Sequence, residues 1–138
     1  MRVLLLYFSQ EEAGRAAQEI TRILGAPASS TVGNPRAYPS DSWIEEYDLI
    51  VFFHDQTTAA DTRLAGMDIL CWRCNRPIIV VISKARPFAT YGQGGPYKLQ
   101  PETNPPWRFV CHPDKLAETL EQFQAWEKQP GTKKQEGA

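Results

Sequence analysis

Three aspartates near the middle of the chain have the residue type and spacing that carboxylate chemistry requires. Asp55 directly follows the apolar run of residues 48–54, and Asp61 and Asp68 lie close behind it. A helix would place Asp61 and Asp68 two turns apart on one face, about 10 Å from each other. Burial of Asp68 among its apolar neighbours would raise its pKa and suit it to catalysis. Asp68 and Asp61 are therefore the predicted catalytic residues, although a helix cap at Asp61 and a solvated Asp68 explain them equally well.

The cysteines and histidines do not form a convincing ligand set. Cys71 and Cys74 have metal-ligand spacing, but a zinc site needs about four ligands. Only Cys111, His54 and His112 remain, and Cys111 and His112 are adjacent rather than spaced as a second chelating pair. We therefore predict no metal, with both cysteines of the pair on a core-facing helix side. An odd, low cysteine count argues against a secreted disulfide framework and makes the cytoplasm the expected location.

Apolar periodicity indicates the elements that would position these residues. Continuous apolar runs at 2–8, 48–54 and 78–82 are typical of strands buried on both faces, and residues 28–33 and 107–110 are weaker strand candidates. Helical spacing is expected over residues 11–24, 61–75 and 113–126. Residues 84–106 form a long loop with the run Gly92-Gln93-Gly94-Gly95, which lacks the following helix that a phosphate-binding glycine motif needs.

Alternation of strand and helix predicts an α/β fold, with parallel strands joined by right-handed crossovers. We expect a flavodoxin-like, doubly wound sheet of five strands in the order 2-1-3-4-5, as one domain over residues 1–128 with a disordered tail at 129–138. Ligands in such sheets bind beyond the carboxyl ends of the strands. The segments 7–12, 54–61 and 83–95 are therefore the candidate site.

Charge and hydropathy exclude several classes of partner. The formal net charge is −1, so no basic field is present to attract nucleic acid or an anionic membrane. The apolar run at the start is too short for a membrane helix, and Gln10-Glu11-Glu12 stands where a signal-peptide cleavage site would be. A soluble protein with a small-molecule ligand is expected, and self-association is left open.

The region from Trp43 to Ile82, about a third of the chain, carries a recognisable succession of motifs. Residues 44–51 read Ile-Glu-Glu-Tyr-Asp-Leu-Ile-Val, residues 62–68 read Thr-Arg-Leu-Ala-Gly-Met-Asp, and residues 76–79 read Arg-Pro-Ile-Ile. This succession resembles the nucleoside 2-deoxyribosyltransferase superfamily, which includes the deoxynucleoside-monophosphate N-glycosidases. In that resemblance Thr62 matches the small hydroxyl position and Asp68 the position of the family glutamate.

The resemblance implies an enzyme acting on a nucleoside or nucleotide without a cofactor. Asp68 would act at the anomeric carbon as nucleophile or electrostatic stabiliser of an oxocarbenium-like transition state. The other implied substrate-binding residues fall into three groups. Asp61 and Asp55 would hold sugar hydroxyls or supply the general acid, Tyr7, Ser9 and Thr62 would contact base or sugar, and Ser83, Lys84 and Arg86 would meet a 5′-phosphate.

Two alternatives remain open. The run Leu6-Tyr7-Phe8-Ser9-Gln10 resembles the first strand of flavodoxins, which implies FMN binding. Tyr91 and Trp107 could stack on a flavin, but no motif aligns them with it. Flavodoxins continue with a Thr/Ser-Gly-Asn-Thr loop, whereas this chain has Glu11-Glu12-Ala13-Gly14-Arg15, and two carboxylates repel a phosphate dianion. The third reading is a non-catalytic nucleotide-binding or protein-interaction module of the same topology, such as a degenerate Toll/interleukin-receptor-like domain.

Overall fold

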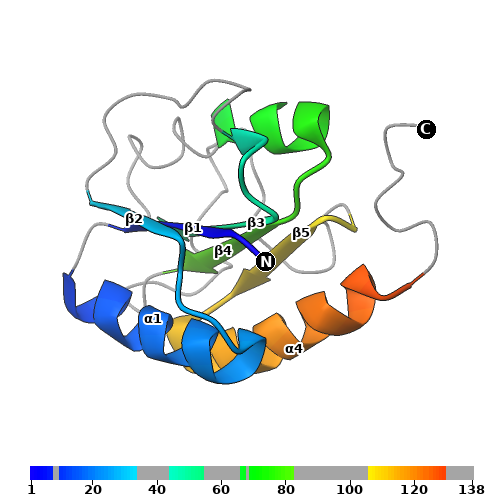
Figure 1. Ribbon diagram of the computed structural model, residues 1–138. Coiled ribbons are helices and arrows are strands. Elements are labelled where there is room, and N and C mark those ends of the chain that lie inside the picture. The colour runs from blue at the N-terminus through cyan, green and yellow to red at the C-terminus, as the bar shows by residue number, and fades with distance from the viewer. Residues whose placement is uncertain (8–9, 34–43, 55–65, 68, 83–105, 130–138) are drawn as a thin grey trace, which may run out of the picture.

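The described part of the chain combines strands and helices, as Figure 1 shows. The computed structural model describes residues 1–7, 10–33, 44–54, 66–67, 69–82 and 106–129. Residues 66–67 and 69–74 are helical as well. The elements that follow one another are β1 (Val3–Tyr7), α1 (Gln10–Leu24), β2 (Ser30–Gly33), β3 (Leu49–His54), β4 (Ile78–Ile82), β5 (Arg108–Cys111), the 3-10 turn η2 (Pro113–Lys115) and α4 (Leu116–Glu127).

The strands form one parallel sheet with the order β2-β1-β3-β4-β5. Leu4 pairs with Ile50 between β1 and β3, and Ile50 pairs in turn with Ile78 of β4. Strand β5 pairs with β4, and the short β2 pairs with β1. The predicted α/β class with a parallel sheet is confirmed.

The two faces of the sheet bury separate apolar clusters, because successive side chains of a strand point to opposite faces. Helices α1 and α4 cover one face through Ala16, Ile20, Leu120 and Phe123. The helical residues 66–67 and 69–74 lie over the other face, where Met67, Leu70 and Cys71 pack against Phe52 and Val80. Figure 1 shows this arrangement, with α1 and α4 below the sheet and the helix after β3 above it. Burial on both faces explains the uninterrupted apolar runs of β1, β3 and β4.

Local signals end two of the helices. Gly25 has a φ of 81° and donates its amide to Thr21 O at 3.0 Å, which closes α1 with a left-handed residue. Asn75, with a φ of 57°, plays the same part after residue 74. The amides of Asn75 and Arg76 reach back to Trp72 O at 3.4 Å and Cys71 O at 2.8 Å, a Schellman arrangement.

The structure refines some predicted boundaries. The fifth strand runs one residue later than predicted and takes in Cys111, and a 3-10 turn precedes α4. Residues 84–105 of the predicted loop and the tail from residue 130 lie outside the described residues, as does the start of the predicted helix at 61–75. Among the described residues, no helix has the length and apolar character needed to cross a membrane.

Candidate functional site

The carboxyl edge of the sheet brings the ends of β1, β3 and β4 side by side. Leu6 pairs with Phe52, and His54, the last residue of β3, pairs with Ile82, the last residue of β4. Helix α1 follows β1 on one face, whereas the helix after β3 lies on the opposite face. The crossovers therefore diverge between β1 and β3, and in open α/β sheets that point is where ligands bind.

Tyr7 is the one predicted site residue within the described part of the chain. It is the last residue of β1, is partly buried, and packs against the apolar cluster between the sheet and helices α1 and α4. Tyr7 therefore ends β1 at the carboxyl edge, with its ring against the face of the sheet that α1 and α4 cover. The other predicted residues lie outside the described ranges, namely Ser9, Asp55, Asp61, Thr62, Asp68, Ser83, Lys84 and Arg86.

His54 is the titratable side chain that the described structure adds to this edge. It is only 1% exposed, and its ring lies 6.2 Å from that of Phe52 in an edge-on arrangement. An imidazole there can donate one hydrogen bond and accept another. The sequence signalled it only by its place at the end of the strongest strand, which says nothing of its burial.

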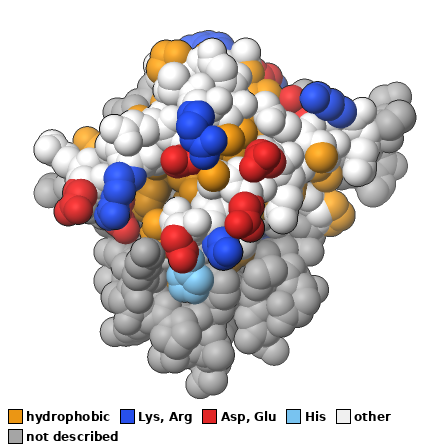
Figure 2. Space-filling view, turned by 90° about the horizontal axis from the view of Figure 1, so that it is seen from below, with side chains coloured by type: hydrophobic (Ala, Val, Ile, Leu, Met, Phe, Trp, Pro, Cys, Tyr) orange, Lys and Arg blue, Asp and Glu red, His pale blue; other side chains and the backbone are white. Residues whose placement is uncertain are grey.

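A groove of about 410 Å³ opens near the same edge, on the face of the sheet that α1 and α4 cover. Its floor includes Phe53, which precedes His54, and its two walls come from α1 and from the start of α4. Figure 2 shows this face, with acidic and basic side chains interspersed around apolar atoms. The residues lining the groove are Glu12, Arg15, Ala16, Gln18, Glu19, Arg22, Phe53, Pro113, Asp114, Leu116 and Ala117.

The charged walls of the groove are largely neutralised by their own neighbours. Arg22 pairs with Glu19 one turn away, and Arg15 lies 3.7 Å from Glu11. These pairs are exposed, so each contributes little to stability. The groove therefore presents no single sign of charge to a ligand. The groove could not be predicted from the sequence, because its walls lie about a hundred residues apart in the chain. The helices α1 and α4 that form these walls are joined by a hydrogen bond from Gln124 Nε2 to Ile23 O at 3.1 Å.

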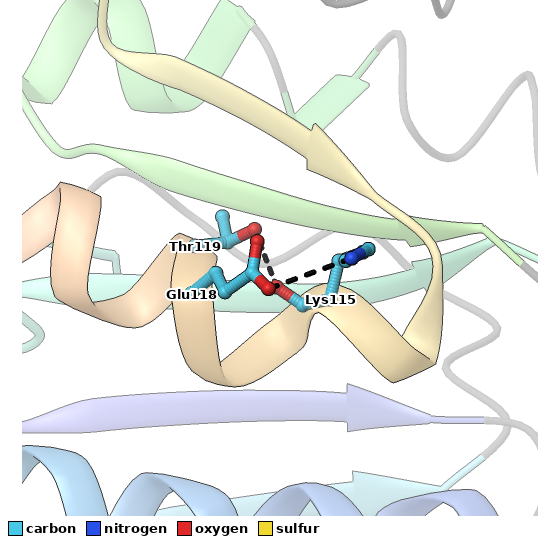
Figure 3. A network of polar contacts seen from close by, with 3 residues as sticks. All are labelled: Lys115, Glu118 and Thr119. Carbon is cyan, nitrogen blue, oxygen red and sulfur yellow. Dashed lines mark hydrogen bonds and ion pairs between the residues drawn. The ribbon is translucent and has the colours of Figure 1, made fainter.

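Polar contacts order the first turn of α4 beside the groove. Thr119 Oγ1 donates to the backbone oxygen of Lys115 at 2.8 Å, and Lys115 Nζ lies 3.5 Å from Glu118 Oε1 (Figure 3). Thr119 also bonds the buried Cys111 thiol. Burial raises the pKa of Cys111 to about 11, the Thr119 bond works against this, and the Asp114 charge adds to it. Cys111 is consequently a protonated, unreactive thiol at neutral pH.

The described residues offer little support for a metal or flavin site. Within the described ranges, no group of three or more His, Cys, Asp or Glu could hold a metal ion. Trp107, a candidate to stack a flavin under the flavodoxin alternative, is 9% exposed, and its backbone oxygen accepts from the amide of Ile78, the first residue of β4. It therefore lies at the amino edge of the sheet, opposite the candidate site, which disfavours a flavin contact. Tyr91 lies outside the described residues.

Comparisons with protein-family models, curated proteins and solved structures returned no match for this chain. Function is therefore argued from the residues and the fold alone.

Proposed function

We propose that the protein is a nucleoside or nucleotide N-glycosidase, or a 2-deoxyribosyltransferase-like enzyme, that works at the carboxyl edge of a flavodoxin-like five-stranded sheet. Asp68 acts at the anomeric carbon as nucleophile or electrostatic stabiliser, and Asp61 or Asp55 supplies the general acid or holds sugar hydroxyls. Tyr7, Ser9 and Thr62 contact the base or sugar. Ser83, Lys84 and Arg86 bind a 5′-phosphate.

One observation supports the proposal more than any other, and it is the register of the three inner strands. Strands β1, β3 and β4 end next to one another, at Tyr7, His54 and Ile82. Ser9, Asp55 and Ser83 follow these ends within one or two residues of sequence. The proposed sugar, acid and phosphate contacts thus begin from neighbouring strand ends, as an active site on a parallel sheet requires.

The flavodoxin alternative is less well supported. Glu11 and Glu12 occupy the first turn of α1, where a phosphate-binding flavodoxin loop would meet the helix. Carboxylates there oppose an FMN phosphate. Trp107 is also buried at the opposite edge of the sheet, as described above.

Base release from deoxynucleosides tests the proposal directly. The protein is incubated with the four common deoxynucleosides and their 5′-monophosphates, and free base is followed by chromatography. We expect release to fall by at least ~10²-fold in Asp68→Asn, since the variant lacks the charge that the transition state needs. Glu121→Gln, on the exposed side of α4, is the matched control and should keep full activity.

Two results would contradict the proposal. Release undiminished in Asp68→Asn would remove Asp68 from the mechanism. Absence of release from every substrate, at high protein concentration and long times, would leave only a binding role for the edge. A flavin absorbance band and fluorescence quenching on addition of FMN would then identify the flavodoxin alternative.

A further inference from the structure

The pair Cys71 and Cys74 sits on one side of the last helical turn before β4. Cys71 is fully buried and packs in the cluster with Met67 and Leu70, whereas Cys74 is partly exposed and packs against the edge of that cluster. No disulfide joins them in this structure. Among the described residues they belong to no group of three or more side chains that could hold a metal ion, and the proposed function does not use them.

We propose that Cys71 and Cys74 are a reversible dithiol modification site, which a low-molecular-weight disulfide such as oxidised glutathione converts to an intrahelical disulfide. Cys74 is the attacking residue because it is the one that solvent reaches. Cys71 is the resolving residue behind it.

Helix geometry allows the bond at the cost of a small local change. Residues three apart in a helix have Cα atoms about 5 Å apart, within the ~4.4–6.8 Å range found across disulfides. Their Cβ atoms are ~5–6 Å apart and must close to ~3.5–4.5 Å. The Schellman turn at Asn75 ends the helix directly after Cys74, so the change falls on a terminal turn rather than a helix interior.

The polar surroundings of Cys74 set how readily it reacts. Its thiol points to Glu45, with Sγ 3.9 Å from Glu45 Oε1. Arg76 Nη1 donates to the Cys74 backbone oxygen at 3.0 Å, and Arg76 Nη2 donates to the Glu45 backbone oxygen at 3.0 Å. The carboxylate disfavours a thiolate and the guanidinium favours it. Formation of the disulfide turns Sγ away from Glu45 and so loosens the contact between the turn at residues 44–47 and the helix.

The exchange balances in two steps. The Cys74 thiolate attacks one sulfur of the small disulfide, forming a mixed disulfide and releasing one thiolate. Cys71 then passes its proton to the released thiolate, attacks Cys74 Sγ and expels the second thiolate. Two protein thiols are oxidised, and one small disulfide is reduced to two thiols.

Cys111 provides an internal comparison. It belongs to the cluster on the opposite face of the sheet and is only 5% exposed. The sheet separates its thiol from Cys71 and Cys74, so it can form a disulfide with neither.

The experiment treats the folded protein with oxidised glutathione at mildly alkaline pH and measures intact mass and disulfide-linked peptides. We expect a loss of about 2 Da, with Cys71 linked to Cys74 and Cys111 still a thiol, reversed by excess reduced glutathione. Cys71→Ala should instead hold a stable glutathione adduct on Cys74, and Cys74→Ser should remain unmodified. Glu45→Gln should react several-fold faster, which a merely exposed thiol elsewhere would not do.

Three outcomes would overturn the proposal. They are a mixed disulfide on Cys74 that persists in the wild-type protein, a link that involves Cys111, and no reaction of the wild-type protein. Should Cys71→Ala fail to fold by circular dichroism, the wild-type peptide map decides the matter by itself. None of these outcomes depends on N-glycosidase activity.

Discussion

At the scale of single residues, Cys111 is the side chain whose chemistry the structure changes most clearly. It is the last residue of β5 and packs in the apolar cluster between the sheet and α4. Its pKa is raised from 9.0 to about 11, chiefly by burial. The charged form is thus disfavoured only in the folded state, because the unfolded chain exposes the thiol to water. Folding stability must therefore depend on pH through this group.

We predict that the protein loses about 2–3 kcal/mol of stability through Cys111 as pH rises from 9 to 11. In that window the unfolded thiol has released its proton while the folded one retains it, so each rise in pH favours unfolding. The contribution is fully present below pH 9. Urea unfolding of the wild type and of Cys111→Ala at several pH values measures it, since the difference between the two removes the titration of lysines and tyrosines. A wild-type curve parallel to that of the variant would show that Cys111 does not titrate differently on folding.

At the scale of elements, two glycines, one inside α1 and one directly after it, have opposite structural roles. Gly14 is exposed within the helix, and an added Cβ would meet nothing within 4 Å. Gly25 has equal space, but its φ of 81° is one that side chains rarely adopt. Alanine at the two positions isolates the backbone contribution, because neither substitution creates a clash.

We predict that Gly14→Ala raises the free energy of unfolding by about 0.5–1 kcal/mol, because alanine loses less entropy than glycine in a helix. Gly25→Ala should lower it by about 1–2 kcal/mol, because alanine is strained in the left-handed conformation. Chemical denaturation of both variants against the wild type measures the two values. Changes of the same sign would mean that the end of α1 does not need the left-handed residue.

The same local signals explain which elements could be predicted from sequence. The end of the helix before β4 and the start of β4 follow from Pro77 and the β-branched run after it. The end of α1 follows from Gly25. The short β2 was a weak prediction, since four residues carry little periodicity and its place depends on pairing with β1. Elements could therefore be predicted from local sequence where the apolar pattern is long or where a glycine or proline marks its end.

The candidate site was less predictable for physical reasons. The edge of the sheet could be foreseen, because parallel topology places strand ends together, and Tyr7 lies there. The groove could not, since it depends on packing between α1 and α4, whose contact joins Ile23 to Gln124. The burial of Trp107 at the amino edge likewise follows from its register beside Ile78 rather than from its residue type.

At the scale of the whole molecule, stability is concentrated in the centre of the sheet. All six residues of β3 are buried, and β3 pairs with strands on both sides, β1 and β4. Strand β5 stands at one edge and contains the half-buried Phe109. Removing β3 from the sheet would expose both apolar clusters at once, whereas opening β5 exposes less apolar surface.

We predict that the backbone amides of β3, and those of β4 that face β3, exchange with solvent only through global unfolding. The hydrogen-bonded amides of β5 should exchange through smaller openings, with a lower opening free energy and a weaker dependence on denaturant. Native-state hydrogen exchange at increasing urea concentrations measures both quantities residue by residue. Ile79 of β4 is the internal reference, because it is fully buried and the register directs its amide toward β3. In β5 the register directs the amide of Phe109 toward β4. If Phe109 were as protected as Ile79 and its exchange rose as steeply with urea, the sheet would open as one unit and stability would not be graded from its centre to its edge.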